Sequence, residues 1–179
     1  MGKNILIIST SLRKNSNSDA LSEAFLSGAN EVGHFVEKIN IIGKNITFCT
    51  GCLKCLNSHR CVIHDYADTV VQKMRKADVI VFATPIYYYE MSGQMKTLLD
   101  RANPLYGSDY SFRDVYILTT AAEDDSYVSK NAENGLKGWI ECFPKATLKG
   151  SLFVGGVDFE GAIVNNPNLS KAYEMGKQV

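Results

Sequence analysis

The sequence predicts an α/β fold in which helices cover both faces of an open, five-stranded parallel sheet. Runs of consecutive apolar residues, such as ILII at residues 5–8 and VIVFAT at residues 79–84, are typical of parallel strands buried on both faces. Segments with apolar residues at helical spacing separate these runs. Strands that alternate with helices favour a parallel sheet that is covered on both sides.

The first half of the chain supplies two strands, one helix and one irregular segment. A strand at residues 5–8 precedes a helix at residues 19–32, which Gly33 is placed to end. A second strand is expected at residues 35–42. Residues 45–65 are polar and rich in cysteine without a sustained period, so we expect a functional loop there.

The second half continues the alternation. Asp65 can cap a helix at residues 66–76, and the third strand, at residues 79–84, is expected to end at Pro85. Five strands of this kind favour a flavodoxin-like three-layer sandwich with strand order 2-1-3-4-5, and 179 residues suit one domain. The remaining elements are helices at residues 93–102, 127–143 and 170–177, and strands at residues 115–120 and 148–154.

Charge and hydropathy narrow the classes of partner. The chain has 19 Lys and Arg against 19 Asp and Glu, so no overall basic field attracts nucleic acid or an anionic membrane surface. No apolar run reaches the roughly 18 residues of a membrane span, and the apolar stretch near the N-terminus is too short for a signal peptide. We therefore expect a cytoplasmic protein with no nucleic-acid or membrane partner.

The stretch that follows the first strand has the character of a phosphate site. Residues 9–18 carry hydroxyl and amide side chains together with Arg13 and Lys14 where the chain turns into a helix. A helix N-terminus presents unpaired backbone N–H groups and a positive dipole end, which together favour an anion. A helix capped by Ser16 or Ser18, with nothing bound, would show the same pattern.

A second unusual stretch follows the third strand, where three tyrosines stand in a row at residues 87–89. They cannot all be buried by one face of a strand or helix, so at least one should remain exposed. A planar aromatic ligand would pack against such residues, and a subunit interface is the alternative.

These stretches should meet at one edge of the sheet. In open α/β sheets, ligands bind beyond the carboxyl ends of the strands, and residues 9–18, 85–93 and 119–125 all follow such ends. A phosphate site beside an aromatic loop favours FMN. A dinucleotide fits less well, because no G-x-G-x-x-G follows the first strand.

Two motifs, ISTSLRKNSNS and TPIYYYEMSGQMKTLLDR, resemble the NAD(P)H-dependent FMN reductase group of flavodoxin-like flavoproteins. The resemblance covers about residues 3–154, with departures at Leu12, where the family commonly has proline, and at Ser16, where glycine is common. The resemblance implies NAD(P)H as electron donor, an unknown electron acceptor and a homodimer or homotetramer. It indicates no catalytic side chain.

The resemblance also implies which residues bind FMN. The phosphate would be held by Ser9, Ser11, Arg13, Ser16, Asn17 and Ser18. The isoalloxazine ring would lie along Pro85, Ile86, Tyr87, Tyr88 and Tyr89, with Ser92 and Gly93 supporting the turn and Thr119, Thr120 and Ala121 opposite.

Four of the five cysteines form a compact motif, C-x2-C-x2-C-x5-C, at Cys49, Cys52, Cys55 and Cys61. Four thiolates are what a [4Fe–4S] cluster needs, whereas zinc sites use similar pairs, and thiols without any metal are the third possibility. The motif resembles that of the iron–sulfur flavoproteins. Cys142 is expected to be a small buried hydrophobe.

We therefore expect one FMN-binding domain over residues 1–179 with a cysteine-rich insertion at about residues 45–65. Its expected function is that of an FMN-containing oxidoreductase, either an NAD(P)H-dependent reductase or an electron-transfer iron–sulfur flavoprotein. The alternative is a non-enzymatic flavodoxin-like binding module with a structural zinc site.

Overall fold

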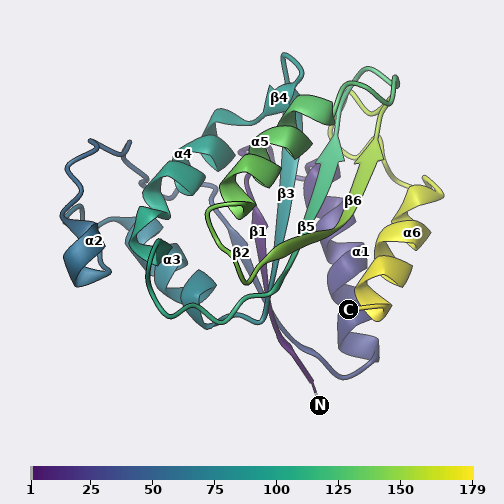
Figure 1. The fold of residues 1–179 in the computed structure, drawn as a ribbon. Helices are drawn as coiled ribbons and strands as arrows, with labels where there is room; N and C mark the ends of the chain where they lie inside the picture. Colours follow the sequence, from purple (N-terminus) through teal and green to yellow (C-terminus); the bar gives the residue numbers. More distant parts are fainter. Residues whose placement is uncertain (1) are drawn as a thin grey trace.

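The computed structural model describes residues 2–179 and has a parallel sheet at its centre (Figure 1). The sheet order is β2-β1-β3-β5-β6, with all four pairings parallel. Counted along the chain, these five strands have the order 2-1-3-4-5, so the predicted winding is confirmed. The parallel strands are β1 (Asn4–Ser9), β2 (Phe35–Asn40), β3 (Val79–Tyr87), β5 (Asp114–Thr120) and β6 (Thr147–Val154).

Helices cover both faces of the sheet, as Figure 1 shows. Alternation along β1 sends Ile5 and Ile7 into one apolar core and Leu6 and Ile8 into the other. The first core lies under α1 (Asn17–Glu31) and α6 (Asn168–Lys177), and the second lies under α3 (Tyr66–Lys76), α4 (Gly93–Arg101) and α5 (Lys130–Ile140).

The closest helix contact joins α1 to α6 through two glycines. A Cβ atom on Gly28 would lie 2.0 Å from the carbonyl oxygen of Tyr173, and one on Gly176 would lie 2.1 Å from that of Phe25. Any larger residue would therefore force the two backbones apart. This contact holds the second half of α1, whose other end borders the site described below.

Three short elements were not predicted. These are α2 (Cys55–Ser58) inside the cysteine segment, β4 (Glu90–Met91) and the 3-10 helix η1 (Asn103–Leu105). Each is too short to show a hydrophobic period. β4 pairs antiparallel with the end of β3 and so forms a hairpin.

The structure corrects three sequence expectations. Pro85 does not end β3, which continues to Tyr87; pairing with β1 stops at Ala83, so proline sits where no β1 neighbour needs its N–H group. The helix expected at residues 127–143 is shorter at both ends, because α5 spans Lys130–Ile140 and a turn in which the Phe143 amide donates to the carbonyl oxygen of Ile140 at 2.7 Å follows it. Cys142 is exposed rather than buried, because it follows the last turn of α5.

Within residues 2–179, no helix is long and apolar enough to cross a membrane.

Candidate functional site

The carboxyl ends of four strands meet at a cavity of about 140 Å³. The ends of β3 and β5 and the segments that follow β1, β5 and β6 each contribute residues, as the parallel topology requires. The lining includes Ser11, Arg13, Ser16, Asn17, Ser18, Pro85, Ile86, Tyr87, Thr120 and Ala121, all predicted from the sequence, together with Ala122, Val157 and Asp158.

The first turn of α1 forms one wall of this cavity. Ser16 caps the helix, since its side-chain oxygen accepts a hydrogen bond from the Asp19 amide at 3.1 Å. The backbone amides of Asn17 and Ser18 precede the first intrahelical bond, which runs from Ala20 to Ser16. This end of the helix therefore offers amide donors and a positive dipole to an anion.

A buried hydroxyl lies at the end of β1, the strand that leads into this part of the chain. Ser9, the last residue of β1, is fully buried, and within residues 2–179 its Oγ has no hydrogen-bond partner. Burying an unpaired hydroxyl is costly. The backbone amides of Asn17 and Ser18, with the hydroxyl groups of Ser11 and Ser16 that line the cavity, make the wall fit a phosphate group.

The loop after β6 forms a wall that sequence analysis missed, through Val157 and Asp158. The side-chain amide of Asn17 donates to the carbonyl oxygens of Val157 and Phe159 at 3.1 and 2.8 Å and accepts from the Ile163 amide at 3.1 Å. Arg13 donates to the carbonyl oxygen of Asp158 at 2.7 Å. The side chain of Asn17 therefore anchors this loop, and its backbone amide remains for a ligand. The segment has no hydrophobic period and lies beyond the recognised motifs, so no sequence signal pointed to it.

The hairpin of β3 and β4 presents the three tyrosines. Tyr88 and Tyr89 occupy the two central turn positions with φ of 49° and 64°, a left-handed backbone that is uncommon for bulky residues. Tyr88 is 99% exposed, and its neighbours are half exposed. The expectation that at least one tyrosine stays exposed is confirmed, and the strained turn marks the hairpin as a functional feature.

Ser92 fixes the base of this hairpin. Its buried hydroxyl accepts from the Met95 amide as the N-cap of α4 and lies 3.1 Å from Thr84 Oγ1 and 3.2 Å from Thr10 Oγ1. One hydroxyl thus joins the ends of β1 and β3 to the start of α4.

Glu123 joins the hairpin to the loop after β5. Its carboxylate accepts hydrogen bonds from the hydroxyl groups of Tyr89 at 2.9 Å and Tyr127 at 2.8 Å. The two rings stack with centroids 5.8 Å apart and planes 15° apart. The hydrogen bond to Glu123 raises the pKa of Tyr127 well above its usual range. This contact joins the hairpin to the loop after β5 at the same edge of the sheet.

All four clustered cysteines line a second cavity, of about 330 Å³. None of them is in a disulfide; Cys55 is buried and Cys49 and Cys52 are exposed. Within residues 2–179, no three His, Cys, Asp or Glu side chains converge closely enough for a single metal ion. Zinc would need four ligands at roughly 2.3 Å from one point. A [4Fe–4S] cluster binds each thiolate to a different iron, so four free thiols around a wider cavity fit a cluster better.

A buried ion pair closes the cysteine segment. Arg101, whose side chain is fully buried at the end of α4, donates two hydrogen bonds to Asp65, at 2.7 and 2.9 Å. The same guanidinium donates to the carbonyl oxygens of Thr47 at 2.6 Å and Ile63 at 3.0 Å, one at each end of the segment. Burial opposes the charges, but the pairing with Arg101 still holds the pKa of Asp65 below its ordinary value. Asp65 and Cys61 likewise raise the pKa of Arg101.

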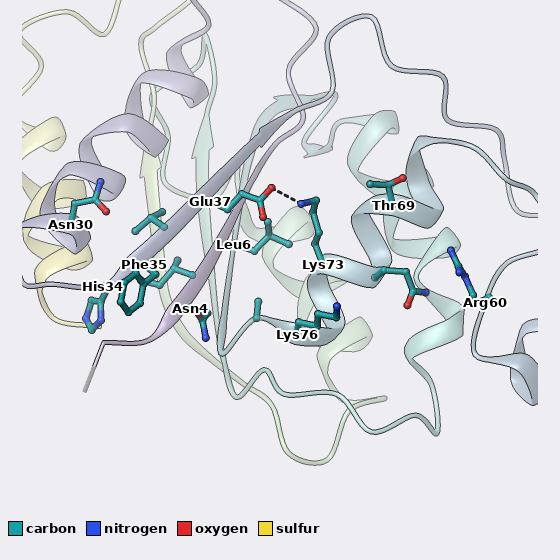
Figure 2. Close-up of a pocket in the computed structure, with 14 residues that line it drawn as sticks. Asn4, Leu6, Asn30, His34, Phe35, Glu37, Arg60, Thr69, Lys73 and Lys76 are labelled. Carbon is teal, nitrogen blue, oxygen red and sulfur yellow. Dashed lines mark hydrogen bonds and ion pairs between the residues drawn. The ribbon is translucent and has the colours of Figure 1, made fainter.

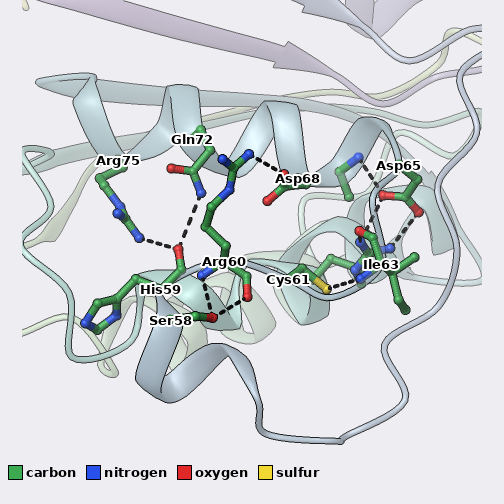
Figure 3. A network of polar contacts seen from close by, with 11 residues as sticks. Ser58, His59, Arg60, Cys61, Ile63, Asp65, Asp68, Gln72 and Arg75 are labelled. Carbon is green, nitrogen blue, oxygen red and sulfur yellow. Dashed lines mark hydrogen bonds and ion pairs between the residues drawn. The ribbon is translucent and has the colours of Figure 1, made fainter.

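Further polar contacts hold the second half of the segment to α3 (Figure 3). Arg60 pairs with Asp68 at 2.7 Å, and Arg75 donates to the carbonyl oxygen of His59 at 2.7 Å. The cysteine segment is therefore attached to the domain mainly by charged and polar side chains.

A wider hollow of about 940 Å³ lies beside β2 and α3 (Figure 2). The close-up shows Lys73 paired with Glu37 across it, at 2.7 Å, and Phe35 at its rim. None of the predicted site residues lines this hollow, and it lies away from the carboxyl ends of the strands. We therefore place the functional site at the two smaller cavities.

Comparison with known families agrees with this geometry. A family model described as NADPH-dependent FMN reductase matches residues 3–155, which is most of the chain. The chain belongs to the NADPH-dependent FMN reductase family. It is thus an FMN-binding oxidoreductase with a nicotinamide nucleotide as partner, as predicted. The alternative of a non-enzymatic binding module is set aside.

Relatives of this FMN reductase family member include two iron–sulfur flavoproteins. The protein from Methanosarcina thermophila is 33% identical over 174 residues, covering 96% of this chain and 91% of the relative. The one from Archaeoglobus fulgidus is 30% identical over 174 residues, covering 93% of this chain and 74% of the relative. A solved NAD(P)H:quinone oxidoreductase from Methanothermobacter marburgensis has a TM-score of 0.77 at 16% identity, covering 99% of this chain and 96% of that one. This last likeness confirms the fold.

Proposed function

We propose that the protein is an iron–sulfur flavoprotein with two cofactor sites. FMN would occupy the cavity of about 140 Å³ at the strand ends, which we call the strand-end cavity. A [4Fe–4S] cluster would occupy the cavity of about 330 Å³ lined by the four cysteines, which we call the cysteine cavity. The observation that carries the proposal is that residues at four strand ends line one cavity while all four clustered cysteines line another. The names of the relatives from Methanosarcina thermophila and Archaeoglobus fulgidus support the cluster.

The phosphate of FMN would bind at the first turn of α1. Backbone amides of Asn17 and Ser18 and the hydroxyl groups of Ser9, Ser11 and Ser16 would donate to its oxygens. Arg13 would add positive charge at the outer edge of the cavity.

The flavin ring would lie outside the enclosed part of the cavity. At about 140 Å³ the cavity is smaller than the roughly 300–1,000 Å³ of most small-molecule sites, so it can enclose only part of FMN. Pro85, Ile86 and Tyr87 would then face the ring, with Thr120 and Ala121 opposite. Thr119 Oγ1 donates to the carbonyl oxygen of Leu152 at 3.4 Å. Thr119 would therefore support the side of the site formed by β5 and would not contact the ring.

Bound FMN would supply the redox chemistry, accepting hydride from NAD(P)H and delivering electrons to the cluster or an acceptor. The residues of the chain bind and orient the reactants, and none needs to act as an acid or base. Cys49, Cys52, Cys55 and Cys61 would be the cluster ligands.

The exposed hairpin supports an oligomer. The hairpin presents an aromatic surface of the kind typical of subunit interfaces. It consists of the fully exposed Tyr88 and the half-exposed Tyr87 and Tyr89. We propose a homodimer or homotetramer formed through it. We also propose a cytoplasmic location, because four clustered thiols stay reduced there.

The phosphate site is tested by comparing FMN with riboflavin, which lacks the phosphate. In fluorescence titrations, Arg13→Glu should weaken FMN binding by about tenfold or more because it reverses a charge at the cavity. Riboflavin binding should stay unchanged. Lys171→Glu makes the same change of charge on exposed α6 and is the matched control. Equal losses for FMN and riboflavin, or for both variants, would contradict the assignment.

The reductase activity is tested by mixing FMN-loaded protein with NADH or NADPH without oxygen. Loss of the flavin absorbance near its visible maximum, and its return on adding an electron acceptor, are the expected results. Flavin that binds but is reduced by neither nucleotide would contradict the role of NAD(P)H as donor.

A further inference from the structure

The carboxyl end of α4 and the residues that follow it pack against the cysteine cavity. Asp100 and Asn103 line the cavity, and Arg101 between them spans both ends of the cysteine segment. We propose that Arg101 and Asn103 are positioning residues for the cluster: Arg101 holds the four-cysteine segment closed, and Asn103 sets the reduction potential through Cys55. This inference rests on the proposed cluster.

Arg101 is placed to fix the entry and the exit of the segment at once. Thr47 precedes Cys49 by two residues and Ile63 follows Cys61 by two, and the carbonyl oxygens of both accept hydrogen bonds from the same guanidinium. Asp65 holds the guanidinium with two more. A planar group with five donors can serve several acceptors at once, which a lysine cannot.

The guanidinium also retains a donor without a partner. Arg101 Nε is buried, and it finds no acceptor within residues 2–179. A buried unpaired donor is costly, so its presence favours an acceptor that the chain itself does not supply. A cluster held by the four cysteines would bring sulfur atoms close to this end of α4, because Asp100 and Asn103 line the same cavity.

Asn103 contacts the one buried cysteine of the motif. Its side-chain amide donates to Cys55 Sγ at 3.1 Å. Adding an electron to a cluster increases the negative charge on its sulfur atoms, and a hydrogen-bond donor stabilises that charge. The contact should therefore raise the reduction potential of a cluster bound through Cys55.

The other end of α4 provides an internal control. Ser92 caps α4 beside the hairpin of β3 and β4. The helix therefore runs from the side of the strand-end cavity towards the cysteine cavity, between β4 and α2 in Figure 1. FMN binding therefore reports whether a variant at Arg101 or Asn103 is still folded.

The test for Asn103 uses protein purified without oxygen and a potentiometric titration followed by electron paramagnetic resonance. Asn103→Ala should bind FMN and iron like the wild type while its cluster has a lower reduction potential. Asn57→Ala, on the exposed side of α2 in the same segment, is the control and should leave the potential unchanged. Equal potentials in Asn103→Ala and wild type would overturn the role of Asn103.

The test for Arg101 is the iron content of Arg101→Lys, which keeps the charge. We expect full FMN binding with cluster affinity weakened by about tenfold or more, as for other residues that orient metal ligands. Full iron retention would overturn the role of Arg101. Wild-type protein without iron would refute the cluster itself, and this inference with it.

Discussion

The two cavities differ in what holds them together. The walls of the strand-end cavity are the ends of β1, β3 and β5, the start of α1 and the loop after β6. The strands and α1 are continuous with the two apolar cores. The cysteine cavity lies on a segment with three of four cysteines outside the core, fastened by Arg101, Asp65 and contacts to α3. The flavin site is thus a consequence of the fold, whereas the cysteine site depends on a few polar contacts.

The difference shows where single substitutions should act. Removing one polar partner should disturb the cysteine segment strongly, because its anchor is a buried charge pair. Single changes at the flavin rim should have smaller effects on stability, because the cores beneath it stay packed.

The largest effect is expected for Asp65→Ala. The substitution leaves Arg101 buried without its partner and removes the N-cap of α3, so stability should fall by about 3–5 kcal/mol. Urea unfolding at neutral pH measures the loss. Asp109→Ala, whose side chain is 99% exposed, is the matched control and should change stability by less than about 0.5 kcal/mol. Equal losses of stability in the two variants would show that the buried ion pair does not hold the cysteine segment.

The same ion pair predicts a pH dependence. The pKa of Asp65 in the folded protein lies below its ordinary value of 3.8, so its contribution is complete above that pH and is lost as pH falls towards the folded pKa. The stability difference between wild type and Asp65→Asn should therefore be full near neutral pH and shrink below about pH 4. A difference that stays constant with decreasing pH would contradict the assignment.

A smaller effect is expected for Ser92→Ala at the base of the flavin hairpin. Loss of the N-cap of α4 and of the contacts to Thr84 and Thr10 should cost about 1–2 kcal/mol. Weaker FMN binding should accompany it, while iron content stays unchanged. Ser170→Ala, on the exposed face of α6, is the control. A larger loss of iron than of FMN would show that the two cavities are not independent.

The smallest effect on stability is expected for Glu123→Ala. Glu123 is exposed, so losing its bonds to Tyr89 and Tyr127 should change stability by less than about 0.5 kcal/mol. FMN should nevertheless dissociate several-fold faster, because the contact across the loops is gone. Stopped-flow release of FMN measures this rate, and an unchanged rate would show that the contact has no part in holding the flavin.

The sequence predicted the sheet order because long apolar runs and helical periods cover most of β1, β3, β5 and their helices. It also located the residues at strand ends, since parallel topology brings such ends to one edge. The cavity confirms that these loops meet, whereas their binding of FMN stays a prediction.

Other features had no local signal. The bond network of Asn17 with residues 157–163 and the bridge from Arg101 to Thr47 join positions far apart in the chain, and nothing in either segment indicates the partner. Pro85 inside β3 was mispredicted because the effect of a proline depends on whether a neighbouring strand needs its N–H group.

The central claim is that one chain holds FMN in one cavity and a cluster in the other. The most direct test is to measure flavin, iron and zinc in protein purified without oxygen, together with its visible spectrum. We predict one FMN and about four irons per chain, with iron, but not FMN, lost when all four clustered cysteines are changed to serine. Zinc in place of iron, or FMN that is lost together with the cysteines, would contradict this account.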